Sequence, residues 1–289
     1  MPRRIREFII EACIKLSGLA VIIFVVSIFL FLLKDSLSLF GVYSVRDFLF
    51  GTKWLPISEP PRFGIVPLLL GSLYVTFGAI VICVPLGVGS AMFIAEVAPS
   101  HLKHVLKALV EILAAIPSVV LGFIGIVWLG PYLRSTLGLS TGMCGLTGSL
   151  LLAFMALPTV ISISEDALIG VPKAFKEAAF GLGATRWQAL WRIVLPSASS
   201  GIIAAVMLGI GRVIGETMVV MMVTGNSPVI PKSLLQPLRT LTATIAGEMG
   251  ETVAGSEHYF ALFAVGLILF IITFVINFIA DVCLRRARK

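Results

Sequence analysis

Long apolar runs separated by short polar segments dominate the hydrophobic pattern of this chain. A helix crosses the hydrocarbon core of a bilayer with about 20 predominantly apolar residues, and six stretches are long enough. They are residues 13–33, 66–95, 108–132, 143–164, 197–225 and 259–283. The pattern therefore predicts an all-α polytopic membrane protein with six transmembrane helices. Six crossings would place both termini on the same side of the membrane.

The composition agrees with a membrane protein and excludes an ordinary water-soluble domain. Of the 289 residues, 58% are hydrophobic and 13% are charged, whereas a soluble domain has about 25% charged residues. The mean hydropathy is +1.06. The 4 cysteines are far apart and form no C-x-x-C pair, so the sequence predicts neither a metal cluster nor a disulfide framework.

The positions of the basic residues predict the orientation of the chain. The formal net charge is +7. If both termini are cytoplasmic, the inner segments hold about twice as many Lys and Arg residues as the outer loops, which is the bias of cytoplasmic loops. Once these charges are assigned to loops, no basic stripe is left to bind a nucleic acid. We therefore expect cytoplasmic termini, a surrounding lipid bilayer and no nucleic-acid partner.

The segment between the fourth and fifth spans is patterned as two short helices. Pro172 suits a first helical turn, and Gly183 suits a left-handed residue after the last turn. Thr185 and Gln188 have the spacing of a capping box, which would start a second helix. The second helix would carry one apolar stripe, formed by Trp187, Leu190, Trp191 and Val194. The pattern fits either an interfacial amphipathic element or a docking element for another protein.

This loop also resembles a known signature. Glu177-Ala178-Ala179, Gly183 and Ile193-x-Leu195-Pro196 match every fixed position of the E-A-A-x3-G-x9-I-x-L-P pattern of ABC importer permeases. In that family the loop forms the coupling helix that fits a cleft on a cytoplasmic ATPase subunit. The resemblance implies an ATPase-docking loop that includes Glu177, Ala178, Ala179, Gly181, Gly183, Thr185, Arg186 and Trp187.

The resemblance also implies a fold and a division of labour between subunits. Residues 66–289 would form the transmembrane domain of a type I ABC importer permease, with the coupling loop at 165–196. Residues 1–65 would form an N-terminal cytoplasmic segment, the first transmembrane helix and an outer loop. The chain has no G-x-x-x-x-G-K-[ST] phosphate loop, so ATP hydrolysis would occur on another subunit. We expect a transport subunit that is not an enzyme, without a cofactor or metal of its own, and ATP and Mg on the partner ATPase.

Two charged residues lie inside the predicted fifth span. Along a helix, Arg212 would be about 24 Å from Pro196 and about 21 Å from Asn226, near the middle of the bilayer. Glu216 follows four residues later and would share its helical face. Charges at this depth are costly and usually face a cavity or a partner. The pair is either a substrate contact or an internal salt bridge that neutralises both groups.

The chemistry of arginine favours an anion at this position. A guanidinium presents five donors in a planar fork that matches phosphate oxygens, and it stays charged at physiological pH. Arg212 is therefore the candidate contact in a substrate path, and Thr217 is a candidate hydroxyl donor. Glu216 could hold the guanidinium, act in a gate or accept a proton from the anion. By contrast, His101 and His104, spaced i, i+3 in an inner loop, are typical of a solvated helix face.

A second resemblance narrows the substrate. Residues 211–218, Gly-Arg-Val-Ile-Gly-Glu-Thr-Met, resemble the G-R-x-I-G-E-T-M segment of phosphate-specific importer permeases, and so do Val84-Pro85-Leu86-Gly87 and Leu157-Pro158-Thr159. The Met-rich stretch ending at Gly225-Asn226 favours the PstC-like subunit of that family over its PstA-like companion. The resemblance implies transport of inorganic phosphate. It also implies a complex with a PstA-like permease, two ATP-binding subunits and an extracytoplasmic phosphate-binding protein.

From the residues alone, three other functions are alternatives. An importer permease for another oxyanion, such as phosphonate or sulfate, would share the fold. A channel subunit would differ because its flux would not need ATP. An intramembrane hydrolase would need a buried nucleophile beside a base, and the sequence places no such base near Ser118 or Ser162. We therefore expect a multi-pass subunit of an ATP-driven importer in the bacterial cytoplasmic membrane.

Overall fold

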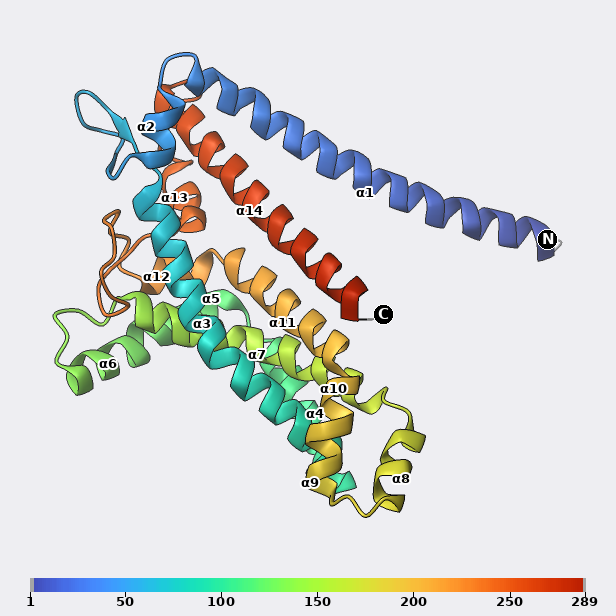
Figure 1. Ribbon diagram of the computed structural model, residues 1–289. Helices are drawn as coiled ribbons and strands as arrows, with labels where there is room; N and C mark the ends of the chain where they lie inside the picture. The colour runs from blue at the N-terminus through green and yellow to red at the C-terminus, as the bar shows by residue number, and fades with distance from the viewer. Residues whose placement is uncertain (1–2, 288–289) are drawn as a thin grey trace.

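The computed structural model describes residues 3–287 of the protein, which are mainly helical (Figure 1). In chain order the helices are α1 (Arg3–Phe40), α2 (Val45–Phe50), α3 (Val66–Met92), α4 (Ser100–Ala114), α5 (Ser118–Ile124), α6 (Gly130–Leu137), α7 (Gly145–Ile169), α8 (Lys173–Gly181), α9 (Arg186–Ala189), α10 (Leu195–Ser197), α11 (Ser199–Ile214), α12 (Met218–Val223), α13 (Leu241–Glu248) and α14 (Glu257–Ala287). The basic residues Arg288 and Lys289, which contribute to the predicted orientation, lie outside the described residues.

Shorter elements join these helices. Three π-helical segments continue α-helices, namely η1 (Phe93–Val97), η2 (Gly125–Leu129) and η3 (Leu190–Val194). Two short strands, β1 (Trp54–Leu55) and β2 (Arg62–Phe63), form an antiparallel hairpin in which Trp54 pairs with Phe63. This hairpin lies in the loop between the first two predicted spans.

Five helical segments of the described chain are long and apolar enough to cross a membrane. They are Ile10–Phe40, Val66–Val97, Ser118–Leu137, Gly145–Ile169 and Glu257–Val282. A sixth crossing results if Arg186–Ser197 and Ser199–Ile214, which meet at a bend of 68°, form one span. The helical membrane fold is therefore confirmed, while the number of six crossings and the cytoplasmic position of the termini stay predictions.

The predicted third span at 108–132 is wrong at its start. The chain breaks between Ala114 and Ser118, and the candidate span is Ser118–Leu137. Proline has no N–H and disfavours a helical conformation in the residue before it. Pro117 consequently becomes the residue that precedes α5 and does not lie within a helix. The preceding α4 has no buried residues and forms a separate helix.

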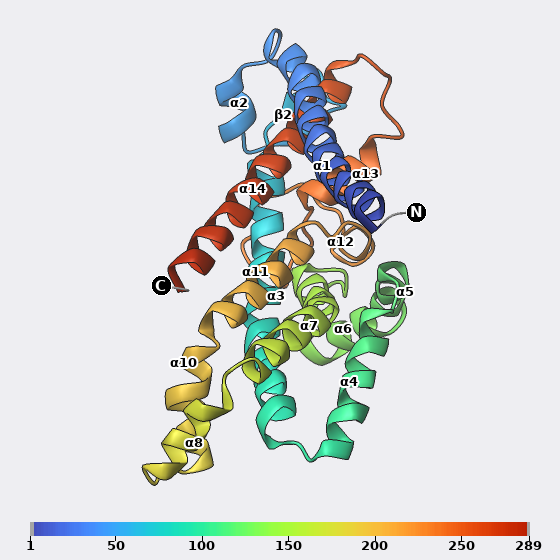
Figure 2. The same cartoon turned by 90° about the vertical axis from the view of Figure 1, so that its right-hand side faces the viewer.

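The elements are distributed between two opposite ends of the molecule. Figures 1 and 2 show α2, the β1–β2 hairpin and α13 together at one end, which we call the hairpin end. Helices α8 and α9, which form the loop predicted to dock an ATPase and called the docking loop below, lie at the other end, which we call the docking-loop end. The chain reaches the hairpin end along α1 and leaves it along α14, so these two helices are antiparallel.

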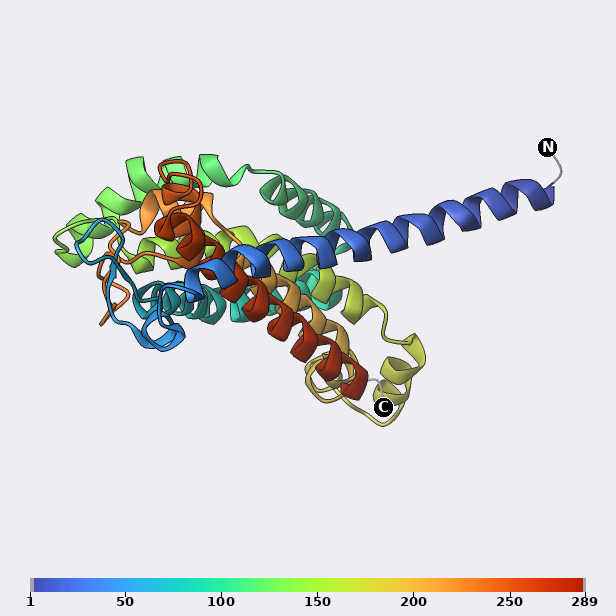
Figure 3. The same ribbon diagram turned by 90° about the horizontal axis from the view of Figure 1, so that it is seen from above.

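Helix α1 packs against α14 near the hairpin end. The rings of Phe29 and Phe270 have centroids 5.6 Å apart, and those of Phe31 and Phe263 are 5.3 Å apart. The beginning of α1 extends beyond the rest of the molecule (Figure 3). Along its apolar stretch the side chains are mostly exposed, as suits a helix whose surroundings are lipid or another subunit.

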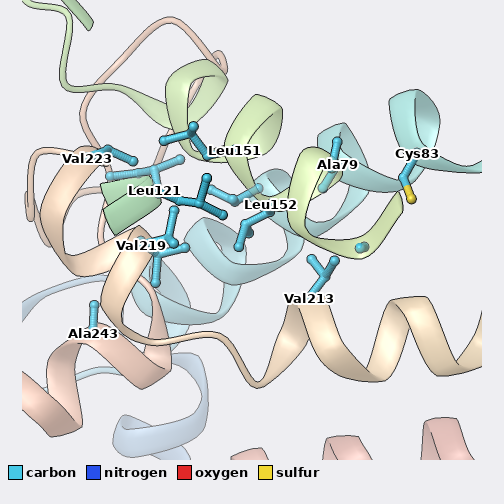
Figure 4. Packing of buried hydrophobic residues seen from close by; sticks show 14 of the residues in the cluster. Ala79, Cys83, Leu121, Leu151, Leu152, Val213, Val219, Val223 and Ala243 are labelled. Carbon is cyan, nitrogen blue, oxygen red and sulfur yellow. The ribbon is translucent and has the colours of Figure 1, made fainter. Parts of the chain in front are cut away.

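The central core lies where α3, α7, α11 and α12 meet. Figure 4 shows Ala79 of α3, Leu152 of α7, Val213 of α11 and Val219 of α12 packed together, and all four are buried. A further cluster under the hairpin end includes Phe48, Trp54, Phe63 and Leu262, and another at the docking-loop end includes Ala91, Leu168, Leu190 and Val194.

Two glycines bring α3 and α11 close to the same residue of α7. A Cβ atom at Gly87 of α3 would lie 2.7 Å from one methyl carbon of Val160, and a Cβ at Gly209 of α11 would lie 2.7 Å from the other. Larger residues would therefore push both helices away from α7. The close approach of α11 places its last turn beside Thr159, the neighbour of Val160.

Candidate functional site

The segment that carries Arg212 and Glu216 is not one continuous helix, so the predicted single span at 197–225 is corrected. Helix α11 ends at Ile214 and α12 begins at Met218, and residues 215–217 form a break between them. Figure 4 shows the irregular path of the chain between Val213 and Val219. In membrane proteins, non-helical backbone is tolerated where other protein or a water-filled cavity surrounds it.

Arg212 lies in the last turn of α11 and is half-buried. Its guanidinium Nη1 donates a hydrogen bond of 3.1 Å to the hydroxyl of Thr159 on α7. The positive charge at the carboxyl end of a helix is favourable, because the helix dipole is negative there. The side chain is therefore oriented by α7, and one of its five N–H donors is used in doing so.

Glu216 lies in the break. The predicted position of Glu216 on the same helical face as Arg212 is therefore wrong. Its carboxylate Oε1 accepts hydrogen bonds from the amides of Met218 at 3.0 Å and Val219 at 3.2 Å, the first two amides of α12. Its carbonyl accepts a hydrogen bond of 2.9 Å from the hydroxyl of Thr242 on α13. No ion pair joins Arg212 to Glu216 within residues 3–287, so the alternative of a neutralising internal salt bridge is not supported.

Thr217 connects the break to α12 and is half-buried. Its hydroxyl donates a long hydrogen bond of 3.4 Å to the carbonyl of Gly215. Arg212, Glu216 and Thr217 are thus brought together at one break, although each has a different local partner. The arrangement leaves a largely unneutralised guanidinium beside unwound backbone, which suits the transient binding of an anion.

The docking loop at the other end of the molecule folds as two helices, as the sequence predicts. Gly183 has a φ of +82°, and an added Cβ would meet no atom within 4 Å. The left-handed backbone, and not a lack of space, therefore explains the glycine. The capping box is present. The backbone N–H of Gln188 donates to Thr185 Oγ1 at 3.2 Å, and the backbone N–H of Thr185 donates to the side-chain Oε1 of Gln188 at 2.9 Å.

The tip of this loop presents an exposed surface. The exposed residues include Glu177, Ala178, Gly181, Gly183, Thr185, Arg186 and Trp187, whereas Ala179 is buried. Of the predicted apolar stripe, Leu190 and Val194 are buried, but Trp187 and Trp191 are 64% and 45% exposed. The two indole rings contact each other edge to face, with centroids 5.5 Å apart. Apolar side chains exposed to this degree are typical of an interaction surface.

An ion pair fixes the first helix of the docking loop to the rest of the chain. Lys176 Nζ of α8 lies 2.5 Å from Glu96 Oε1 of η1, and both side chains are mostly buried. Sequence analysis missed this pair because the two residues are 80 positions apart. The pair joins α8 to the end of the second span, so a displacement of the loop would be transmitted there.

A second polar cluster, at the hairpin end, was also missed. The carboxylate of Glu248, in the last turn of α13, accepts hydrogen bonds from Trp54 Nε1 at 3.1 Å and from Arg239 Nη1. It also lies 2.8 Å from Nε2 of His258 at the start of α14. Glu248 is 12% exposed and Arg239 is 19% exposed. We call these four residues the Glu248 cluster; it joins the β1–β2 hairpin to α13 and α14.

Comparison with known proteins identifies relatives along most of the chain. The profile of the family described as "Binding-protein-dependent transport system inner membrane component" matches residues 83–289. The probable ABC transporter permease protein YqgH of Bacillus subtilis (strain 168) is 39% identical over 271 residues, which are 93% of this chain and 86% of that protein. The phosphate transport system permease protein PstC of Mesorhizobium japonicum is 38% identical over 300 residues, covering 97% of this chain and 88% of that protein.

Solved structures show the same fold at lower sequence identity. A chain of a bacterial alginate ABC transporter, in complex with an alginate pentasaccharide-bound periplasmic protein, superimposes with a TM-score of 0.69 at 16% identity, covering 98% of this chain and 96% of that chain. A chain of the inward-facing MetNI methionine ABC transporter gives a TM-score of 0.60 at 22% identity, covering 80% of this chain and 99% of that chain.

Proposed function

The chain belongs to the family of binding-protein-dependent transport system inner membrane components, and from this premise we propose that it forms the path for inorganic phosphate in an ATP-driven importer. It is an ABC importer permease, a multi-pass inner membrane subunit and not itself an enzyme. A permease of this kind works with an ATPase and a substrate-binding protein.

Phosphate is supported as the substrate by two observations that agree: the names of the relatives and the available guanidinium beside the break. Several relatives that match most of the chain are named phosphate transport system permease protein PstC. Beside the break lies the guanidinium of Arg212, whose one hydrogen-bond partner among the described residues is the neutral hydroxyl of Thr159. A planar cation with free donors suits an oxyanion better than a neutral or cationic substrate.

Arg212 would bind the anion, while Glu216 and Thr217 shape its surroundings. The Glu216 carboxylate is engaged by two amides of α12, so its negative charge is partly offset and directed along the helix axis. The engaged carboxylate would then repel a phosphate bound to Arg212 less than a free carboxylate would. Thr217 would add a hydroxyl close to the same backbone. The contact would be weak enough for release, because it rests on few groups.

The energy would enter through the docking loop. Its exposed tip, with Trp187 and the turn at Gly183, would fit a cleft on an ATPase subunit, and the Glu96–Lys176 ion pair would pass movement to the spans. The complex would contain a PstA-like second permease, two ATP-binding subunits that hold ATP and Mg, and an extracytoplasmic phosphate-binding protein. This chain would need no cofactor of its own.

Uptake of phosphate into proteoliposomes that contain the assembled complex tests this function. Uptake is expected only when ATP is on the ATPase side and the binding protein is on the other side. Uptake without ATP would indicate a channel subunit. ATP turnover stimulated by sulfate or phosphonate, without phosphate uptake, would keep the importer permease but replace its substrate.

A further inference from the structure

Two threonines from different helices contact Arg212, just before the break, and Glu216, within it. Thr159 of α7 accepts the hydrogen bond from Arg212 at 3.1 Å, and Thr242 of α13 donates one to the carbonyl of Glu216 at 2.9 Å. Neither contact is local, because the partners are 53 and 26 residues apart. Two helices, α7 and α13, therefore hold this segment, and each does so through an uncharged threonine side chain.

Thr159 is placed so that it can act on Arg212 and on a bound anion at once. A helical threonine commonly donates its hydroxyl hydrogen to a carbonyl one turn earlier in its own helix, but the recorded contact of Thr159 is to Arg212. Since its oxygen accepts from the guanidinium, its hydrogen stays available to donate to another acceptor. An oxyanion that binds the guanidinium would find this hydrogen next to it.

Thr242 fixes the backbone of the break. Its side chain is 7% exposed, and its hydroxyl bonds to a carbonyl that has left the helical pattern. Thr244, two residues later on the same helix, shows the contrast. It is also buried, but its hydroxyl donates to the carbonyl of Thr240 within its own chain segment, at 2.8 Å. The cross-link to the break is therefore specific to Thr242.

We propose that Thr159 and Thr242 are the positioning residues of the anion contact, a role that rests on the function proposed above. Thr159 orients the flexible arginine before the anion arrives, which reduces the entropy lost on binding. Thr242 keeps the Glu216 carbonyl and the start of α12 in place, so that the carboxylate of Glu216 stays directed at its two amides. Removing either hydroxyl keeps the charges of Arg212 and Glu216 but moves one of them away from its place at the anion contact.

The test compares threonine, valine and serine in the complete complex in proteoliposomes. Valine has nearly the shape of threonine without its hydroxyl, and serine restores the hydroxyl. The readout is the number of phosphate ions imported per ATP hydrolysed, measured on purified, assembled complexes. A defect confined to folding or assembly lowers the yield of complexes but not this ratio, because each assembled complex contributes equally to both terms.

The Thr159→Val and Thr242→Val variants are expected to lower the ratio about tenfold, the loss that corresponds to one hydrogen bond to a charged or structurally fixed group. Thr159→Ser and Thr242→Ser are expected to retain most of it. Thr244→Val is the matched control and should keep the wild-type ratio. Where a valine variant does not assemble, the alanine variant at that position supplies the same measurement with a smaller side chain.

The positioning role would be overturned if Thr159→Val and Thr242→Val kept the wild-type ratio. It would also be overturned if Thr242→Val and Thr244→Val lost the same share of it. These outcomes differ from a failure of the proposed function. In that case the wild-type complex itself would import no phosphate, and no comparison between variants would be needed to see it.

Discussion

The guanidinium of Arg212 donates a hydrogen bond to the hydroxyl of Thr159, and this contact joins α11 to α7 at the point where α11 ends. Because the helix stops at Ile214, Glu216 is turned away and bonds to the amides of α12. The arginine therefore has a neutral partner that leaves its charge available. An anion that binds such a site does not have to displace a carboxylate already paired with the guanidinium.

Replacing Arg212 by lysine is expected to reduce phosphate uptake at least about tenfold, although the charge is kept. An ammonium is a compact charge and cannot present two parallel donors to an oxyanion while it bonds to Thr159. Uptake per assembled complex is the measurement. Arg134→Lys, at an exposed position of α6, is the control and should behave as wild type. Normal uptake by Arg212→Lys would remove Arg212 from the substrate path.

Replacing Gly183 by valine is expected to uncouple ATP hydrolysis from transport. A β-branched residue at a φ of +82° adds strain of about 1–2 kcal/mol and would reshape the turn of the docking loop. The ratio of phosphate imported to ATP hydrolysed should fall, while the subunit still inserts into the membrane.

Gly255 provides a matched control for this variant. It also has a φ of +82°, and an added Cβ there would likewise meet no atom within 4 Å. The Gly255→Val variant should therefore suffer the same backbone strain at the hairpin end without uncoupling. If both variants show the same ratio, the docking assignment of the Gly183 turn is wrong.

Reversing the charge of Lys176 is expected to disturb coupling, and a second reversal should repair it. Lys176→Glu would place two carboxylates together beside α8, and Glu96→Lys in the same chain would restore an ion pair of opposite order. In the double variant the ratio should recover, so that the effects of the two reversals are not additive. The measurement is the phosphate-to-ATP ratio of the single and double variants. Additive effects of the two reversals would show that the pair does not connect the loop to the spans.

Replacing Glu248 by glutamine is expected to loosen the hairpin end. The neutral amide leaves the mostly buried Arg239 without its counter-charge, at a cost of about 3 kcal/mol, the lower end of the range for breaking a buried ion pair. Hydrogen exchange of the amides between residues 51 and 65 should become faster, because the single amide oxygen of glutamine cannot accept from both Trp54 and Arg239 as the two carboxylate oxygens do. Glu251→Gln, at an exposed position, should leave exchange unchanged. Equal exchange in the two variants would argue against a structural role for the Glu248 cluster.

Features that depend on near neighbours could be predicted from the sequence. The turn at Gly183 and the capping box at Thr185 involve residues only a few positions apart, so composition and spacing sufficed. The apolar spans could be located as well, because lipid imposes the same requirement on every residue of a crossing helix. Pro117 indicates the end of α4, although the predicted span at 108–132 includes this proline in its interior.

Features that depend on distant partners could not be predicted. Placing Glu216 on the face of Arg212 assumed a continuous helix, yet Gly215 ends α11 and Thr217 precedes α12. A glycine followed two positions later by a β-branched hydroxyl residue was the available sign of a break. The contacts of Trp54 with Glu248 and of Lys176 with Glu96 join positions 194 and 80 residues apart, and hydrophobic periodicity carries no information on which helices become neighbours.

Helix α13 has a polar contact near each end, and this constrains its length more than its composition. Thr242 in its first turn contacts the break, and Glu248 in its last turn contacts the hairpin and α14. Inserting a single residue between them would rotate one contact by about 100° about the helix axis relative to the other. A substitution inside α13 changes one side chain, whereas an insertion or deletion would shift the contacts at the hairpin end relative to the contact at the break.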